Sequence, residues 1–208
     1  RTMSTIIKNC MMNDVPINPY DMCMGDYLFL LHKLRIVTYG PKYNLSSTCP
    51  YCGHNNEDEI DLNDLLVKTF KDEILDLFEF DLPQTKVHVK IKYQTPRMLD
   101  IINDKVKNFN KKSTDKNLNM QLAYTISSLV EEIDGEKVDR IELEEWAKNL
   151  PMLDTQTIMV YSDAINNSIG FDRRLEAICD ICKLSYNTSF RTTSEFFRPT
   201  INIRRERL

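Results

Sequence analysis

Two Cys-x-x-Cys motifs, far apart in the chain, are the feature that most constrains its fold. Cys49 and Cys52 form the first motif, in Cys-Pro-Tyr-Cys-Gly-His, and Cys179 and Cys182 form the second, in Cys-Asp-Ile-Cys. Two thiolates separated by two residues can both reach one tetrahedral metal ion, and four thiolates make a closed shell of the kind found in structural zinc sites. The sequence therefore predicts one structural Zn²⁺ held by these four cysteines.

Other interpretations of the cysteines remain open at this stage. Residues 53–178 separate the motifs, a far longer stretch than in a compact zinc ribbon. The cysteines could instead be free buried thiols or a redox pair, although neither motif opens a helix after a strand as a thioredoxin-like site requires. His54 could replace one ligand, but we expect it to be a solvated turn residue. Cys10 and Cys23 lack a partner at ligand spacing, so we expect them in the core.

Apolar residues recur at helical spacing in several segments, and capping residues mark some of the helix ends. Asp139 and Asp154 are predicted N-caps, Gly170 is a predicted C-terminal stop, and Asp134-Gly135 is predicted to end a helix in a left-handed turn. The expected helices span about residues 21–35, 98–110, 120–133, 141–150 and 155–169.

The β-structure is predicted mainly beside the cysteine motifs. Residues 86–93 alternate between charged and apolar side chains, the pattern of a half-buried strand. Residues 59–62 are a second candidate, residues 171–179 and 184–197 should form strands that turn at the second motif, and residues 43–51 are expected to be a polar turn.

Together these patterns predict a helix-dominated α+β fold in a single domain over residues 1–208. A small antiparallel, zinc-ribbon-like β element, made by about residues 42–62 and about 171–198, would join the N- and C-terminal segments. A helical insertion would occupy about residues 95–170.

The charge and the apolar content limit the classes of partner. The formal net charge is −4 and the isoelectric point is near 5.5, which gives the chain no overall attraction for a polyanion, so nucleic acid is an unlikely partner. No apolar run approaches the length of a membrane span, and the first residues lack the pattern of a secretion signal. We therefore expect a soluble protein in a reducing cytoplasm.

Sequence motifs for catalysis are missing. The chain contains no phosphate-binding loop, dinucleotide fingerprint, nucleophile elbow or His-Glu-x-x-His motif, each of which would place a nucleophile, base or metal in an open site. We expect no catalytic residue, no cofactor other than zinc and no small-molecule substrate.

Several segments resemble the baseplate hub assembly proteins of T4-type contractile-tailed bacteriophages. The resemblance begins in a helix with a Leu-Arg ending that is followed by the first cysteine motif, and it extends over most of the chain. The segments that carry it are residues 19–21, 25–35, 39–40, 49–53, 133–138, 179–182 and 194–199.

The resemblance implies a viral protein that helps the central hub of the tail baseplate to assemble, as a chaperone or as a minor structural part. Its partners would be other baseplate hub proteins, and its location would be the host cytoplasm during assembly or the virion tail baseplate. The alternative is a nucleic-acid-binding zinc-ribbon factor, based on basic residues with aromatic residues nearby. The residues that motivate it are Lys86, Lys90, Lys92, Arg191, Arg198, Arg204, Arg205, Tyr93, Tyr186, Phe190 and Phe197.

Overall fold

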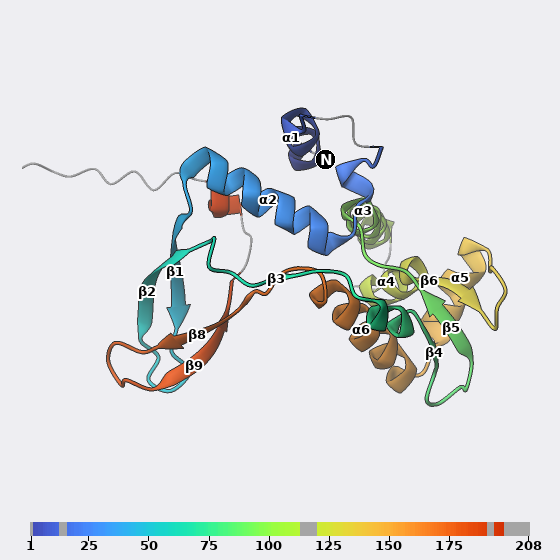
Figure 1. Ribbon diagram of the computed structural model, residues 1–208. Coiled ribbons are helices and arrows are strands. Elements are labelled where there is room, and N and C mark those ends of the chain that lie inside the picture. The colour runs from blue at the N-terminus through green and yellow to red at the C-terminus, as the bar shows by residue number, and fades with distance from the viewer. Residues whose placement is uncertain (1, 13–15, 113–119, 191–193, 198–208) are drawn as a thin grey trace, which may run out of the picture. The chain divides into compact units, whose positions relative to one another are not determined.

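The computed structural model describes residues 2–12, 16–112, 120–190 and 194–197, and its internal contacts divide the chain into two compact units (Figure 1). The helical unit comprises residues 1–27 and 68–170, and the ribbon unit comprises residues 28–67 and 171–208. The fold is mixed α+β with small antiparallel sheets, which confirms the predicted class. The single domain over residues 1–208 stays a prediction.

The helical unit contains most of the helices and one three-stranded antiparallel sheet of order β4-β5-β6. The helix α2 begins in this unit and ends in the ribbon unit. The elements are α1 (Thr2–Cys10), the 3₁₀-helix η1 (Pro19–Asp21), α2 (Met24–Tyr39), the 3₁₀-helix η2 (Asp72–Leu77), β4 (Glu79–Asp81), β5 (His88–Ile91), α3 (Pro96–Lys112), α4 (Gln121–Leu129), β6 (Val130–Ile133), α5 (Arg140–Asn149) and α6 (Met152–Asn167).

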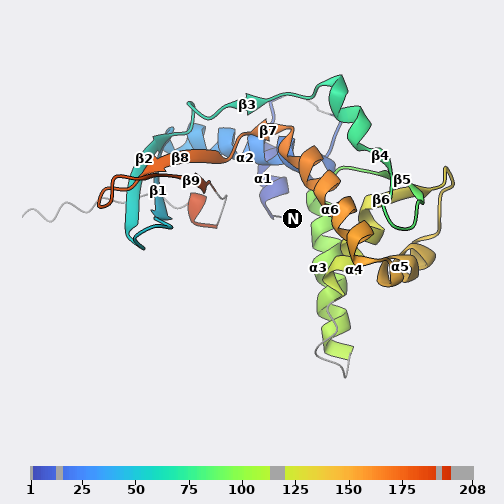
Figure 2. The same cartoon turned by 90° about the horizontal axis from the view of Figure 1, so that it is seen from below.

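One hydrophobic core holds the helical unit together. Figure 2 shows α3, α4, α5 and α6 gathered with the small sheet. Ile126, Leu129 and Ile158 from the helices and Val89 from β5 are each fully buried in this core. Burying such a side chain is worth roughly 1.5–3 kcal/mol, so the apolar periodicity that predicted the helices also accounts for their packing.

The predicted helix over residues 120–133 is wrong in its last turn. The helix α4 ends at Leu129, and Val130–Ile133 continues as the edge strand β6, which pairs with β5. Apolar residues at this end fit a helix and a half-buried strand equally well. Asp134 and Gly135, with φ of 51° and 81°, therefore make the turn that follows a strand rather than a helix stop.

Asp154 does not act as the predicted N-cap. It lies inside the first turn of α6, fully buried, and its carboxylate accepts hydrogen bonds from the backbone N–H groups of Gln84 (2.7 Å) and Thr85 (2.9 Å). Burial raises the pKa of this carboxyl, but these hydrogen bonds outweigh it and leave the pKa below its usual value. Asp139 does cap α5, as predicted, since it accepts from Ile141 N–H at 2.9 Å.

Gly170 serves close backbone packing rather than the predicted helix stop. The helix α6 already ends at Asn167, and Gly170 follows in the short strand β7 (Gly170–Phe171) with φ of 89°. A Cβ atom on Gly170 would lie 2.5 Å from the carbonyl oxygen of Gly25, and one on Gly25 would lie 2.4 Å from that of Ile169. Both glycines are therefore required where these two backbones meet.

Two antiparallel hairpins dominate the ribbon unit, where the sequence predicted a small antiparallel β element. The hairpin β1–β2 pairs Lys42↔Asp61 through Thr48↔Asn55, and the hairpin β8–β9 pairs Arg174↔Ser189 through Ile178↔Ser185. The elements are β1 (Lys42–Thr48), β2 (Asn55–Asp61), β8 (Arg174–Ile178), β9 (Ser185–Ser189) and the 3₁₀-helix η3 (Ser194–Phe197), and the short strand β3 (Val67–Lys68) lies at the boundary between the two units. The predicted turn over residues 43–51 is mostly the strand β1, because its side chains alternate in burial despite their polarity.

Aromatic side chains around His32 form the core of the ribbon unit. His32 is fully buried, and its ring centroid lies 4.7 Å from that of Phe171, 5.1 Å from Phe190 and 5.0 Å from Phe196. Burial lowers the pKa of His32 to about 4, with a further contribution from the charge of Arg173. His32 is therefore a neutral core residue at physiological pH.

Across the described segments, none of the helices combines the length and the apolar character that crossing a bilayer requires.

Candidate metal centre

The four predicted ligands come together at the ends of the two hairpins. Cys49 and Cys52 lie in the turn between β1 and β2, and Cys179 and Cys182 lie in the turn between β8 and β9, side by side in the ribbon unit (Figure 1). Their four Sγ atoms all lie within 4.8 Å of one another. The Cys49 and Cys182 sulfurs are 3.7 Å apart, and the Cys52 and Cys179 sulfurs are 3.5 Å apart.

These separations fit a tetrahedral thiolate site. A Zn–S bond of about 2.3 Å in a tetrahedron requires sulfurs about 3.8 Å apart, close to the shortest distances between the two turns. All four thiols are free, and the close contacts join cysteines of different motifs. The donor set is therefore suited to one closed metal site, whereas a redox Cys-x-x-Cys would pair sulfurs within one motif.

The two turns have the same backbone geometry. Cys49 N–H donates to the carbonyl of His54 (2.8 Å) and its own carbonyl accepts from Gly53 N–H (3.0 Å). In the second turn, Cys179 N–H donates to Leu184 (3.0 Å) and its carbonyl accepts from Lys183 N–H (3.0 Å).

A left-handed residue stands at the same place in each turn. It is Gly53, with φ of 72°, in the first and Lys183, with φ of 61°, in the second. Glycine adopts this conformation without steric cost, whereas lysine is strained there by about 1 kcal/mol or more. The chain therefore builds two equivalent cysteine knuckles, and only the first carries the glycine by which such a turn is recognised in sequence.

The pKa values of two thiols in the cluster are shifted in opposite directions. Burial raises the pKa of Cys179, but hydrogen bonds from the backbone N–H groups of Cys182 and Ile181, together with the neighbouring thiols, lower it to about 6. At Cys52 the backbone N–H of His54 lowers the pKa, but burial and the neighbouring thiols outweigh this and raise it to about 11. One sulfur of the cluster therefore ionises first, and a bound cation would displace the remaining protons.

A buried polar network ties the two hairpins together beside the cysteines. The hydroxyl of Tyr186, on β9, is 2.7 Å from Ser47 Oγ on β1 and accepts a hydrogen bond from Asn56 Nδ2 on β2 at 2.8 Å. Asn56 Oδ1 in turn accepts from Asp180 N–H, inside the second knuckle, at 2.9 Å. All three side chains are buried, so this network fixes one knuckle against the other.

Sequence reasoning missed this network, although a signal for it exists. Ser47 pairs with Asn56 across the first hairpin, and Ala177 pairs with Tyr186 across the second. Ser47 and Ala177 each lie two residues before the first cysteine of their motif. Side chains two apart share a face of a strand, so counting back from the cysteines identifies the residues that face the site.

Replacing Tyr186 by Phe should destabilise the ribbon unit by about 1–3 kcal/mol, because the buried polar groups of Ser47 and Asn56 would lose their shared partner. Chemical denaturation of the zinc-loaded protein measures the change. Tyr51→Phe is the matched control, since Tyr51 lies in the first knuckle with 62% of its surface exposed. Equal stability of the two variants would contradict the role of the network.

The remaining cysteines and histidines lie outside the cluster. Cys10 is exposed and Cys23 is half-buried, so neither is the expected core residue. His54 is half-buried in the first knuckle and contributes its backbone. His88 is exposed, with Nδ1 2.8 Å from a carboxylate oxygen of Asp81.

The structure removes much of the basis for the nucleic-acid alternative. Tyr186 and Phe190 are buried and cannot stack on bases, and the Nζ of Lys90 is 2.6 Å from a Glu79 carboxylate oxygen. Arg191, Arg198, Arg204 and Arg205 lie outside the described residues.

Comparison with known proteins identifies one family. A search of curated proteins and a search of solved structures each found no match. The model of a family described as T4 bacteriophage base plate protein matches residues 1–198, nearly the whole chain. This chain therefore belongs to the T4 bacteriophage base plate protein family.

Proposed function

We propose that the chain is a baseplate hub assembly protein that acts through contacts with other proteins, as a chaperone or as a minor structural component. The observation that carries this proposal is the family match over residues 1–198, because the family is one of phage baseplate proteins. Other hub proteins would be the partners, in the host cytoplasm during assembly and in the tail baseplate if the protein stays in the particle.

The metal centre supports a non-enzymatic role. Four thiolates would fill the coordination shell of a zinc ion and leave no position for substrate or water, which is the arrangement of structural zinc. Zinc at this site would join two hairpins that are each only two strands wide, and such hairpins are marginally stable alone. The ion would thus keep the ribbon unit folded while other surfaces of the protein bind partners.

Affinity purification from infected cells tests the proposal. The chain, tagged at its N-terminus and expressed during infection, should recover baseplate hub proteins that a tag-only control does not, as identified by mass spectrometry. An immunoblot of purified virions separates the two forms of the role, since a structural component remains in the particle and a chaperone does not. Recovery of no baseplate protein above the control would overturn the assembly role.

A further inference from the structure

An open, positively charged cavity of about 670 Å³ lies in the helical unit, where α3 and α5 begin and α4 ends. Four cationic side chains line it, against the single carboxylate of Glu131. They are Lys92 after β5, Arg97 on α3, Lys137 before α5 and Arg140 on α5. A local excess of positive charge in a chain of net charge −4 attracts a negatively charged group to this place.

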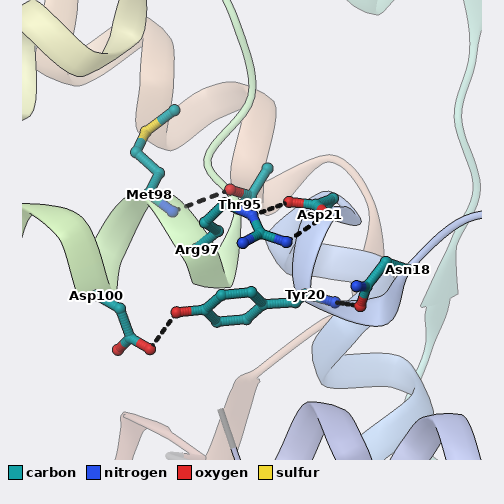
Figure 3. Close-up of polar contacts among 7 residues, drawn as sticks. All are labelled: Asn18, Tyr20, Asp21, Thr95, Arg97, Met98 and Asp100. Carbon is teal, nitrogen blue, oxygen red and sulfur yellow. Dashed lines mark hydrogen bonds and ion pairs between the residues drawn. The ribbon is translucent and has the colours of Figure 1, made fainter.

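Two of these cations already have acidic partners, and two remain available. Figure 3 shows Arg97 directed at Asp21, to which it donates from Nε and from Nη2, the latter at 2.8 Å. The guanidinium carbon also lies 4.5 Å from the centre of the Tyr20 ring. Arg140 Nε is 3.7 Å from a Glu144 oxygen.

Lys92 and Lys137 are both exposed and, within the described part of the chain, form no ion pair. An incoming carboxylate can therefore pair with them without breaking an existing contact.

A second depression, of about 820 Å³, adjoins the first and shares Lys92, Tyr93 and Glu131 with it. Exposed apolar side chains line it, including Phe70 (49% exposed) and Leu75 (57% exposed). Exposed apolar surface beside polar surface marks sites of interaction with proteins.

Lys90 and His88, the basic side chains that line the second depression but not the first, already have acidic partners. The Nζ of Lys90 is 2.6 Å from a Glu79 oxygen, and His88 is 2.8 Å from Asp81. This depression therefore suits an apolar group, whereas the first suits an anion.

We propose that the two depressions form one docking groove for an acidic segment of another baseplate protein. Carboxylates of that segment would pair with Lys92 and Lys137, and an adjacent apolar side chain would cover Phe70 and Leu75. This inference rests on the proposed assembly function and names the chemistry of its partner. A peptide is favoured over a nucleic acid because phosphates would use only the basic half and would leave the apolar half exposed.

Fluorescence anisotropy with a labelled 12-residue peptide of alternating Glu and Phe tests the groove directly. The double variant Lys92→Glu/Lys137→Glu should bind at least about tenfold more weakly, since two attractive pairs become repulsive. Leu75→Ser should also weaken binding, because it removes apolar contact area. Lys107→Glu/Lys111→Glu is the matched control: it makes the same change in net charge at exposed positions of α3 outside the cavity and should bind like the unchanged protein.

Unchanged peptide affinity in Lys92→Glu/Lys137→Glu would overturn the groove. Binding of a single-stranded oligonucleotide of equal charge is the second test. The proposal would be wrong if the oligonucleotide bound more tightly than the peptide, if Lys92→Glu/Lys137→Glu weakened its binding and if Leu75→Ser left its binding unchanged. The site would then be one for nucleic acid. Thermal melts of each variant show that a loss of binding is not a loss of folding.

The purification from infected cells separates this inference from the proposed function. If the unchanged chain recovers baseplate proteins and Lys92→Glu/Lys137→Glu does not, while Lys107→Glu/Lys111→Glu does, both proposals are supported. If all three recover them, the assembly role stands and the groove is wrong as its contact surface. If the unchanged chain recovers none, the assembly role fails, and a baseplate partner for the groove fails with it.

Discussion

Chelation of the purified chain should release one Zn²⁺ per molecule and unfold the ribbon unit while the helical unit stays folded. Structural zinc contributes about 10–16 kcal/mol of binding free energy in zinc-finger peptides, far more than the marginal stability of hairpins only two strands wide, such as β1–β2 and β8–β9. The helical unit keeps its own buried core, which contains Ile126, Leu129 and Ile158. The two units should therefore respond to metal removal very differently.

Two spectroscopic probes distinguish the units. Trp146, the single tryptophan, lies on α5, so its fluorescence reports on the helical unit. Substitution by Co²⁺ makes the thiolate site coloured, and its absorbance reports on the ribbon unit. On chelation the absorbance should vanish while the tryptophan signal changes little, and amide exchange should accelerate over residues 42–61 and 174–189 more than over residues 121–167.

Single substitutions provide the control for metal removal. Cys179→Ser should abolish stoichiometric metal binding, since Cys179 is a fully buried member of the four-cysteine cluster. Cys10→Ser removes an exposed thiol outside the cluster and should leave metal binding and the melting profile unchanged. An unchanged melting profile after complete metal removal would show that the ribbon unit is stable without metal, against this argument.

The cysteine cluster could be predicted from sequence because its geometry is local. Two thiols three positions apart reach one ion wherever the motif occurs, and the strand-like residues beside each motif indicated that the two turns belong together. The second knuckle was harder to read, because Lys183 holds a backbone conformation that usually belongs to glycine. Backbone hydrogen bonds of the turn offset that strain, and backbone hydrogen bonds cannot be recognised from the residue types in the sequence.

Elements that depend on distant contacts were predicted less well. The segment Val130–Ile133 is a strand because it pairs with β5. Asp154 does not cap its helix because its carboxylate binds the backbone N–H groups of Gln84 and Thr85 instead. Both outcomes follow from tertiary pairing that overrides local preference. The basic cavity also depends on tertiary contacts, since its four cations come from two separate stretches of the chain, residues 92–97 and 137–140.

Arg35 should be among the most important single residues for the stability of the ribbon unit. It is buried, with 4% of its surface exposed, and its guanidinium donates to the carbonyl oxygens of Phe196 (2.9 Å), Gly40 (2.7 Å) and Lys42 (3.3 Å). It thus joins the end of α2 to the start of β1 and to η3. Arg35→Ala should lower the free energy of unfolding by about 3–5 kcal/mol, because hydrogen bonds from a charged donor are lost and a buried carbonyl is left without its partner.

Denaturation of the Co²⁺-loaded protein, followed by the absorbance of the thiolate site, measures this loss in the unit where it occurs. Lys33→Ala, which removes the same charge from an exposed position of α2, should cost about 1 kcal/mol or less. The loss of unfolding free energy in Arg35→Lys should lie between the losses in Lys33→Ala and Arg35→Ala, since an ammonium group keeps the charge but cannot reproduce the planar guanidinium that reaches three carbonyls. If Arg35→Lys were as stable as the unchanged chain, the charge alone would suffice, and the argument from the three directed hydrogen bonds would be wrong.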